Sequence, residues 1–211
     1  MFKKFFSGKK ERIRQLETPD QLMVGDIISL KYRELLPPEL REHQLEVSKV
    51  GTYEYSSGTN KEMVLKDEGN HLYFMSLENN DGDVSLCFAK KISRQQVYAL
   101  FDEQLFSQLW DDHWPELGVQ KHPESLTGWL AQSYSQTIKD QQAYYYNRDC
   151  QGEDLAEASD GEELRFHECE GDDNHYGLNV EISDDGSTDV FLQVFCPTDV
   201  IEEMWPHGDK T

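Results

Sequence analysis

The chain of 211 residues lacks the features that would place it in several large protein classes. No apolar run approaches the roughly 20 residues that a membrane-spanning helix needs, and the start of the chain has no secretory signal. The four cysteines are far apart and form no C-x-x-C pair, so neither a disulfide scaffold nor a four-cysteine zinc site is expected. We therefore expect a cytoplasmic protein with unpaired thiols.

Catalytic motifs are also missing. The sequence contains no G-x-S-x-G elbow, no G-x-x-x-x-G-K-[ST] phosphate loop, no H-E-x-x-H and no G-x-G-x-x-G. Pairs of carboxylates occur throughout so acidic a chain by chance, so they identify no acid–base site. We assign no catalytic residue, no cofactor-binding residue and no cofactor, and an enzyme is the less favoured class.

One cluster has the composition of a metal site. His167 and Cys169 are two residues apart, which places them on one face of a strand, and a short acidic loop leads from there to His175. A zinc ion would need a fourth ligand, which Asp172 or Asp173 could supply. Exposed strand positions beside an acidic turn explain the same residues equally well. We therefore predict no metal ligand, and leave open whether this cluster binds one.

Positive charge is scarce and unevenly distributed. The chain has 20 Lys and Arg against 41 Asp and Glu, a net charge of -21, yet residues 1–14 hold six basic residues and one acidic residue. A body this anionic repels phosphates, so direct binding to nucleic acid is not expected. Solubility is the simplest explanation of the charge; the sharper ones are a partner with a basic surface, or mimicry of nucleic acid.

The first residues form a basic, phenylalanine-containing segment. Its phenylalanines fall at helical spacing with lysines on the other face, a pattern typical of helices that lie on anionic membrane surfaces. The alternative is a frayed terminus, or a helix packed on the body. We expect contact with the inner membrane face or with a protein partner through Phe2, Lys3, Lys4, Phe5, Phe6, Lys9 and Lys10.

Alternating apolar residues predict short strands through most of the body. Helices are expected where apolar residues recur at helical spacing after a capping residue, as at Ser93 with Gln96. We predict an α+β fold, with antiparallel meanders and a few helices on one side. The predicted strands are 21–30, 44–55, 62–66, 71–77, 84–89, 143–148, 164–169, 175–182 and 189–196; the predicted helices are 93–109, 124–136 and 200–205. The proposed divisions are a basic segment at 1–17, a meander with helix at 18–110, a helical connection at 111–142 and a second meander at 143–211, which together could form one domain.

The two β-rich halves are similar to each other. A shift of 104 residues aligns His71 with His175, and Gly82 with Gly186, at equivalent strand and turn positions. This similarity suggests duplication of a meander-plus-helix unit, although any meander uses Asp-Gly turns.

Four short segments, 1–6, 24–26, 189–192 and 203–206, contain no catalytic motif but have a distinctive sequence. Together they resemble a bacterial family of unknown function, encoded near phage-shock-protein-A-like membrane-stress genes and polyamine-related genes. The resemblance implies a bacterial cytosolic accessory protein and transfers no active-site residue.

Three functions follow as hypotheses. The first is a non-enzymatic accessory or adaptor protein that works at the inner membrane face or with a basic partner. The second is an acidic nucleic-acid mimic that inhibits a DNA-binding protein, which requires acidic side chains in rows on one face. The third is a small-ligand binder or enzyme with a cleft between the two halves. The oligomeric state is not predicted.

Overall fold

Eleven strands are the main regular elements in the computed structural model, which describes residues 14–80, 82–155, 158 and 160–207. The basic segment expected to contact a membrane or partner lies almost wholly outside these residues. The strands are β1 (Ile27–Leu30), β2 (Gln44–Tyr55), β3 (Gly58–Lys66), β4 (Leu72–Asn80), β5 (Asp83–Ile92), β6 (Glu116–Gly118), β7 (Ser133–Tyr146), β8 (Glu162–Gly171), β9 (Tyr176–Ser183), β10 (Thr188–Pro197) and β11 (Ile201–Trp205).

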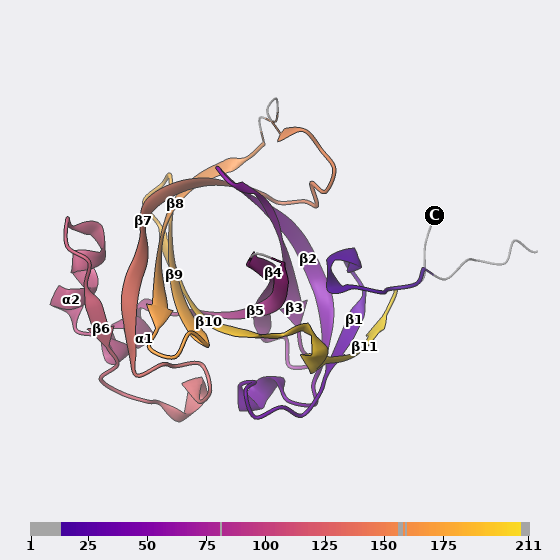
Figure 1. The fold of residues 1–211 in the computed structure, drawn as a ribbon, viewed down its shortest axis with the longest axis horizontal. Coiled ribbons are helices and arrows are strands. Elements are labelled where there is room, and N and C mark those ends of the chain that lie inside the picture. Colours follow the sequence, from indigo (N-terminus) through magenta and orange to yellow (C-terminus); the bar gives the residue numbers. More distant parts are fainter. Residues whose placement is uncertain (1–13, 81, 156–157, 159, 208–211) are drawn as a thin grey trace, which may run out of the picture.

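Eight of these strands close into an antiparallel barrel. The order around it is β2-β3-β4-β5-β10-β9-β8-β7, and the pairing of β2 with β7 completes the ring seen in Figure 1. Closure leaves these strands without a free edge. The predicted α+β fold is therefore wrong: the protein is a β-barrel with short helices outside it. The sequence pattern had identified most strands but not the pairings between the two halves that close the ring.

Each half of the chain contributes one four-stranded meander to the barrel. The two meanders meet along two seams, where the last strands β5 and β10 pair with each other and the first strands β2 and β7 do the same. At the first seam Ala89 lies opposite Gln193, a separation of the same 104 residues that aligns the histidines. This arrangement is the one that a duplicated four-strand unit would give. Strands from segments 18–110 and 143–211 thus share a single barrel, together with most of β7, which lies in the segment 111–142 predicted as a helical connection.

Three helix predictions have different outcomes. The cap at Ser93 is confirmed, because its side chain accepts from the Gln96 backbone at the start of α1 (Arg94–Leu100). The helix does not continue unbroken to residue 109: Asp102 caps a separate helix, α2 (Glu103–Ser107). Residues 124–136 and 200–205 are not helical apart from short 3-10 turns, Glu124–Leu126 and Thr198–Val200, because β7 begins at Ser133 and β11 pairs with β1.

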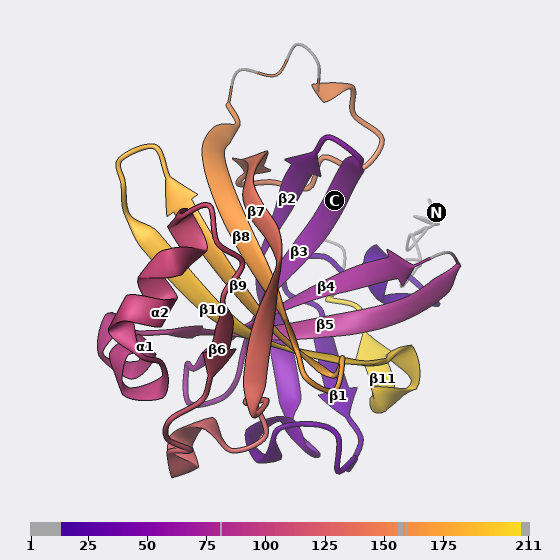
Figure 2. The ribbon, with the colours of Figure 1, turned by 60° about the vertical axis from the view of Figure 1, so that its left-hand side comes forward.

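The main apolar core lies outside the barrel wall. Met75, Phe88 and Val194 are register neighbours on β4, β5 and β10, and all three are fully buried. They belong to one cluster with side chains from α1 and α2, and with residues of the connections on either side of β6, including Trp129. In Figure 2 the helices and β6 lie against the outside of the barrel. The strands are therefore covered on their outer face by the rest of the chain, which leaves the inner face to be explained.

Candidate ligand-binding site inside the barrel

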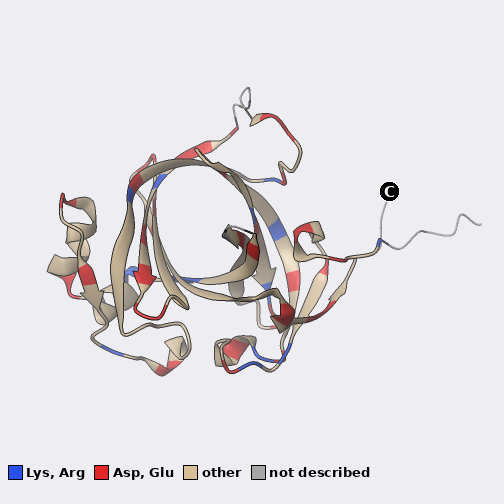
Figure 3. Cartoon of the chain, viewed as in Figure 1, with Lys and Arg blue, Asp and Glu red and all other residues tan. Residues whose placement is uncertain are grey.

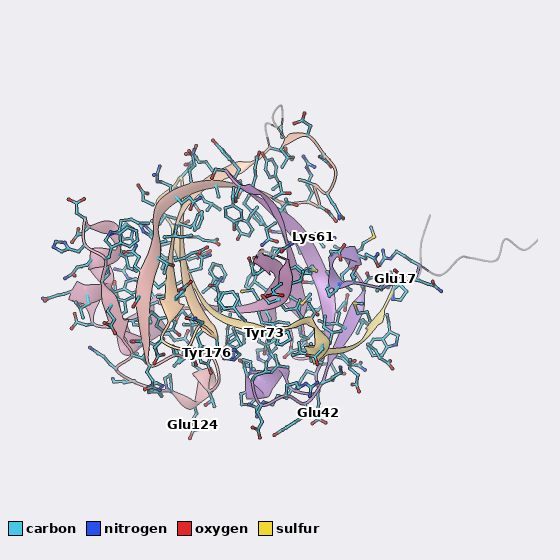
Figure 4. The ribbon with its side chains drawn as sticks, in the orientation of Figure 1. Glu17, Glu42, Lys61, Tyr73, Glu124 and Tyr176 are labelled. Atoms are coloured by element: carbon cyan, nitrogen blue, oxygen red, sulfur yellow. The ribbon has the colours of Figure 1, made fainter. Side chains whose placement is uncertain are left out.

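The inner face of the barrel encloses a cavity of about 420 Å³ that is lined by residues from all eight barrel strands. The lining side chains alternate with those of the outer core: Phe74 and Ser76 flank Met75, and Cys87 and Ala89 flank Phe88. Figure 4 shows side chains projecting from the strands into the ring as well as away from it. The aromatic part of the lining consists of Tyr53, Tyr55, Phe74, Phe166, Phe191 and Phe195.

One end of the interior is filled by aromatic and aliphatic side chains. Tyr145 packs on Tyr53, with ring centroids 4.9 Å apart, in a cluster that includes Leu164 and Ala143. Gly51 allows this packing, because a Cβ atom there would lie 2.2 Å from the Tyr145 hydroxyl. We call this cluster of Tyr53, Ala143, Tyr145 and Leu164 the plug, and it bounds the cavity on the side where β8 begins.

The other end leads to the surface. A second cavity of about 450 Å³ shares Glu78, Glu168 and Gln193 with the first, and its lining also includes the exposed residues Glu170 and Asn174. Along β8 the side chains thus pass from the plug at Leu164, through the cavity at Glu168, to the mouth at Glu170. A small molecule could enter from this side.

Four glutamates line the cavity, and no Lys, Arg or His is among its described lining residues. Glu62 comes from β3, Glu78 from β4, Glu168 from β8 and Glu181 from β9. The nearest lysines are at the periphery: the Lys49 ammonium lies 5.0 Å from the centre of the Tyr145 ring, and that of Lys91 pairs with Asp189 at 2.6 Å. The described lining therefore concentrates acidic groups without a paired cation.

Two of the four carboxylates have hydrogen-bond donors. Glu181 accepts from the Tyr53 hydroxyl at 3.0 Å and from the Asn179 amide at 2.9 Å. Glu78 accepts from the Asn60 amide at 3.1 Å and from the Ser76 hydroxyl at 2.8 Å. These neutral partners hold the two side chains in place without neutralising their charge.

The other two carboxylates have none. Among the described residues no side chain or backbone group donates to the carboxylate of Glu62 or Glu168, and no ion pair includes them. Both side chains are partly exposed toward the cavity, whereas the carbonyl oxygen of the Asn179 side chain, on the strand neighbour of Glu168, is buried without a partner. A buried acceptor of this kind is costly, because it loses water and gains nothing in return.

Burial changes the proton affinity of the interior carboxyl groups. Burial, reinforced by the charge of Glu181 and opposed by Lys49, raises the pKa of Glu62 to about 8. Burial also raises the pKa of Glu168 to about 7, with further contributions from Glu78, Glu170 and Glu181. The pKa of Glu181 rises to about 7 for the same reason, although its hydrogen bonds from Tyr53 and Asn179 act in the opposite direction. The interior carboxyl groups therefore retain protons near neutral pH.

The Tyr55 phenol is at the centre of this group. Burial first, and then the charges of Glu181, Glu168, Glu78 and Glu62, raise its pKa well above the usual value. Its ring packs edge-on against Phe166 at 5.3 Å between centroids. A neutral phenol surrounded by four carboxyl groups and phenylalanine rings marks the point where polar and apolar parts of the cavity meet.

The metal-like cluster does not assemble. His167 and Cys169 do share a strand face, but it is the outer one, where His167 Nδ1 accepts from the Asp140 backbone N–H at 3.3 Å and burial lowers its pKa. His175 Nε2 instead donates to the Leu35 carbonyl at 2.9 Å. Among the described residues no group of three or more His, Cys, Asp or Glu side chains has the arrangement of a metal site. The described cysteines are all free and buried.

The interior glutamates were missed by the sequence analysis. Glu168 and Glu181 follow the apolar–polar alternation of β8 and β9, which looks the same whether the polar face meets solvent or a cavity. The one available signal was the presence of phenylalanine on the same face, since Phe166 precedes Glu168 by two residues.

None of the helices that the structure describes combines the length and the apolar character of a membrane span.

Comparison with known proteins gives no family. No family model, no curated protein and no solved structure matches this chain significantly. The function is therefore argued from the site alone.

Proposed function

We propose that this protein is a non-enzymatic binding protein that holds a small molecule inside its barrel. The observation that carries the proposal is the closed ring of eight strands around a cavity of about 420 Å³ with one plugged end and one polar mouth. Small-ligand sites have volumes of roughly 300–1,000 Å³ and combine apolar walls with a few polar groups. This is the third hypothesis from the sequence, with the site moved from a cleft between the halves to the barrel that both halves enclose.

Binding suits the interior better than covalent or transfer chemistry. Acyl and phosphoryl transfer require positive groups or aligned donors opposite the developing negative charge, and the described lining has no cationic side chain. Cys87 lines the cavity, but burial raises the pKa of its thiol well above the usual value. The Cys87 thiol is therefore not an activated nucleophile.

The acidic residues are not concentrated as a nucleic-acid mimic requires. Figure 3 shows acidic segments on all sides of the barrel and on the outer connections. That distribution does not favour one phosphate-like row. An adaptor role through the N-terminal segment concerns residues outside those described and is compatible with a ligand in the barrel.

A cavity-filling variant tests the proposal. Ala89 lines the cavity on β5, whereas Val84 on the same strand is exposed, so Ala89→Phe should fill the site and Val84→Phe should serve as the matched control. We expect ligand-observed NMR with a library of cationic, neutral and anionic fragments to show binding to the wild type and to Val84→Phe, and loss in Ala89→Phe.

A second filling variant, Gln193→Phe, covers the case in which Ala89→Phe does not fold, because Gln193 lies opposite Ala89 in the neighbouring strand. Absence of any bound fragment, or binding that both filled variants retain, would contradict a site in the barrel.

A further inference from the structure

Several acceptor groups in the interior have neither a hydrogen-bond donor nor a positive charge beside them among the described lining residues. The groups without a donor among the described residues include the carboxylates of Glu62 and Glu168, which face the cavity, and the buried side-chain oxygen of Asn179. Tyr55, Gln141 and Gln193 could donate, but no bond from them to these carboxylates is present among the described residues, and they carry no charge. What the cavity lacks is a positive group with several N–H donors.

We infer that the barrel binds a small organic cation, a protonated amine on an aromatic or aliphatic body, with its ammonium group at the interior carboxylates, which include Glu62 and Glu168. This inference rests on the proposed function and specifies its ligand class. An ammonium group has three donors and one positive charge, so it satisfies the acceptors and neutralises part of the charge in one step. The phenylalanine rings of the wall accommodate the body of such a ligand and attract its charge through their faces.

An organic cation fits better than a metal ion. A divalent cation needs several ligands that converge at short distances, and the described residues contain no such group. Neutral donors, including the neighbouring side chains Ser76 and Asn179, already orient the carboxylates of Glu78 and Glu181. These two carboxylates are therefore held apart from a common metal-binding point. The aromatic lining between the carboxylates also suits a ligand with an apolar part.

Protons and the cation compete for the same carboxyl groups. The charged groups that act on Glu62 are Glu181 and Lys49, and those that act on Glu168 are Glu78, Glu170 and Glu181. Lys91, which acts on Glu181, is held by Asp189 at the rim. A bound ammonium therefore displaces protons from the glutamates, so its affinity rises with pH through the neutral range.

Three probes of the same shape distinguish the effect of the ligand's charge from the effect of burying its aromatic ring. Phenethylammonium, 2-phenylethanol and phenylacetate carry a positive, a neutral and a negative group on one aromatic body. In calorimetric titrations of the full chain at weakly alkaline pH and low salt, we expect phenethylammonium to bind at least about tenfold more tightly than the alcohol, and phenylacetate to bind most weakly.

The glutamate variants locate the charge. Glu62→Gln and Glu168→Gln should each weaken phenethylammonium by about tenfold or more and leave 2-phenylethanol unchanged. Glu46→Gln is the matched control, because Glu46 is an exposed glutamate on β2 outside the cavity, and it should change neither.

The outcomes distinguish this inference from the proposed function. Equal affinity for the cation and the alcohol, lost in Ala89→Phe, would overturn the cation and leave a barrel site. Cation binding that Ala89→Phe retains, or no binding of any probe to the wild type, would contradict both. Cation binding that neither Glu62→Gln nor Glu168→Gln weakens would overturn the assignment of the ammonium group.

Discussion

The side chains on the two faces of the barrel wall differ in how many of them have partners within the chain. On the outer face Phe88 and its neighbours are buried against helices and connections from the same chain. On the inner face the same strands present glutamates, two of which have no partner among the described residues. A residue that stabilises the fold and one that awaits a ligand can therefore be adjacent in sequence, since strand side chains alternate between faces. Burial alone therefore does not identify the core of this protein.

The largest expected effect comes from the outer face. Phe88→Ala should lower the free energy of unfolding by about 3–5 kcal/mol, because it leaves a cavity in a packed cluster. Phe74 on the neighbouring strand is only partly buried and borders an existing cavity, so Phe74→Ala should cost less than half as much. Denaturant titrations of both variants check the comparison; equal losses would show that the inner face is packed like the outer one.

An effect of opposite sign is expected from the inner face. Glu62→Gln removes an unpartnered charge and should raise the free energy of unfolding of the ligand-free protein by about 1 kcal/mol or more at weakly alkaline pH. The folded pKa of Glu62, about 8, lies above its ordinary value of 4.5, so the folded state holds a proton that the unfolded chain releases. Stability from this group is complete below pH 4.5 and is lost as pH rises to 8.

The measurement is unfolding at a series of pH values, with Glu46→Gln as the control. The Asp67 and Asp140 pKa values are lowered, chiefly through bonds to His71 and Arg165 despite the opposing effect of burial, so these groups change stability only in more acidic solution. A steep loss of stability across neutral pH that Glu62→Gln does not reduce would show that another group is responsible.

The smallest effect concerns an exposed side chain at the start of an outer helix. Ser93→Ala removes the cap of α1 and should cost about 1 kcal/mol without changing the affinity for phenethylammonium. Thermal unfolding together with calorimetry checks both parts. A change in affinity as large as that of the glutamate variants would mean that the outer helix and the interior are coupled.

The sequence analysis predicted local structure better than global structure. The predicted strand 44–55 coincides with β2, and strands near 72–80, 83–92 and 176–183 were found within a few residues of their ends, because each shows a period of two. The helix predicted at 124–136 failed because Leu126 and Trp129 supply apolar spacing in a connection, where Gly128 adopts a positive φ of 79° beside Pro37.

The barrel and its site could not be predicted for a different reason. The pairings that close the ring join residues about 90–110 positions apart, such as Tyr53 with Tyr145 and Ala89 with Gln193, and no local pattern encodes them. Without the closure, Glu62 and Glu181 are ordinary polar strand residues. The acidic composition hid them further, since they are among 41 acidic residues.

The most direct test is an NMR titration of the carboxyl carbons of Glu62 and Glu168, assigned through the Gln variants, with and without phenethylammonium. For the free protein we expect midpoints near 8 for Glu62 and near 7 for Glu168, both lowered when the cation is bound. Midpoints near the ordinary pKa of 4.5 that the cation does not change would contradict the claim that these interior glutamates bind an organic cation.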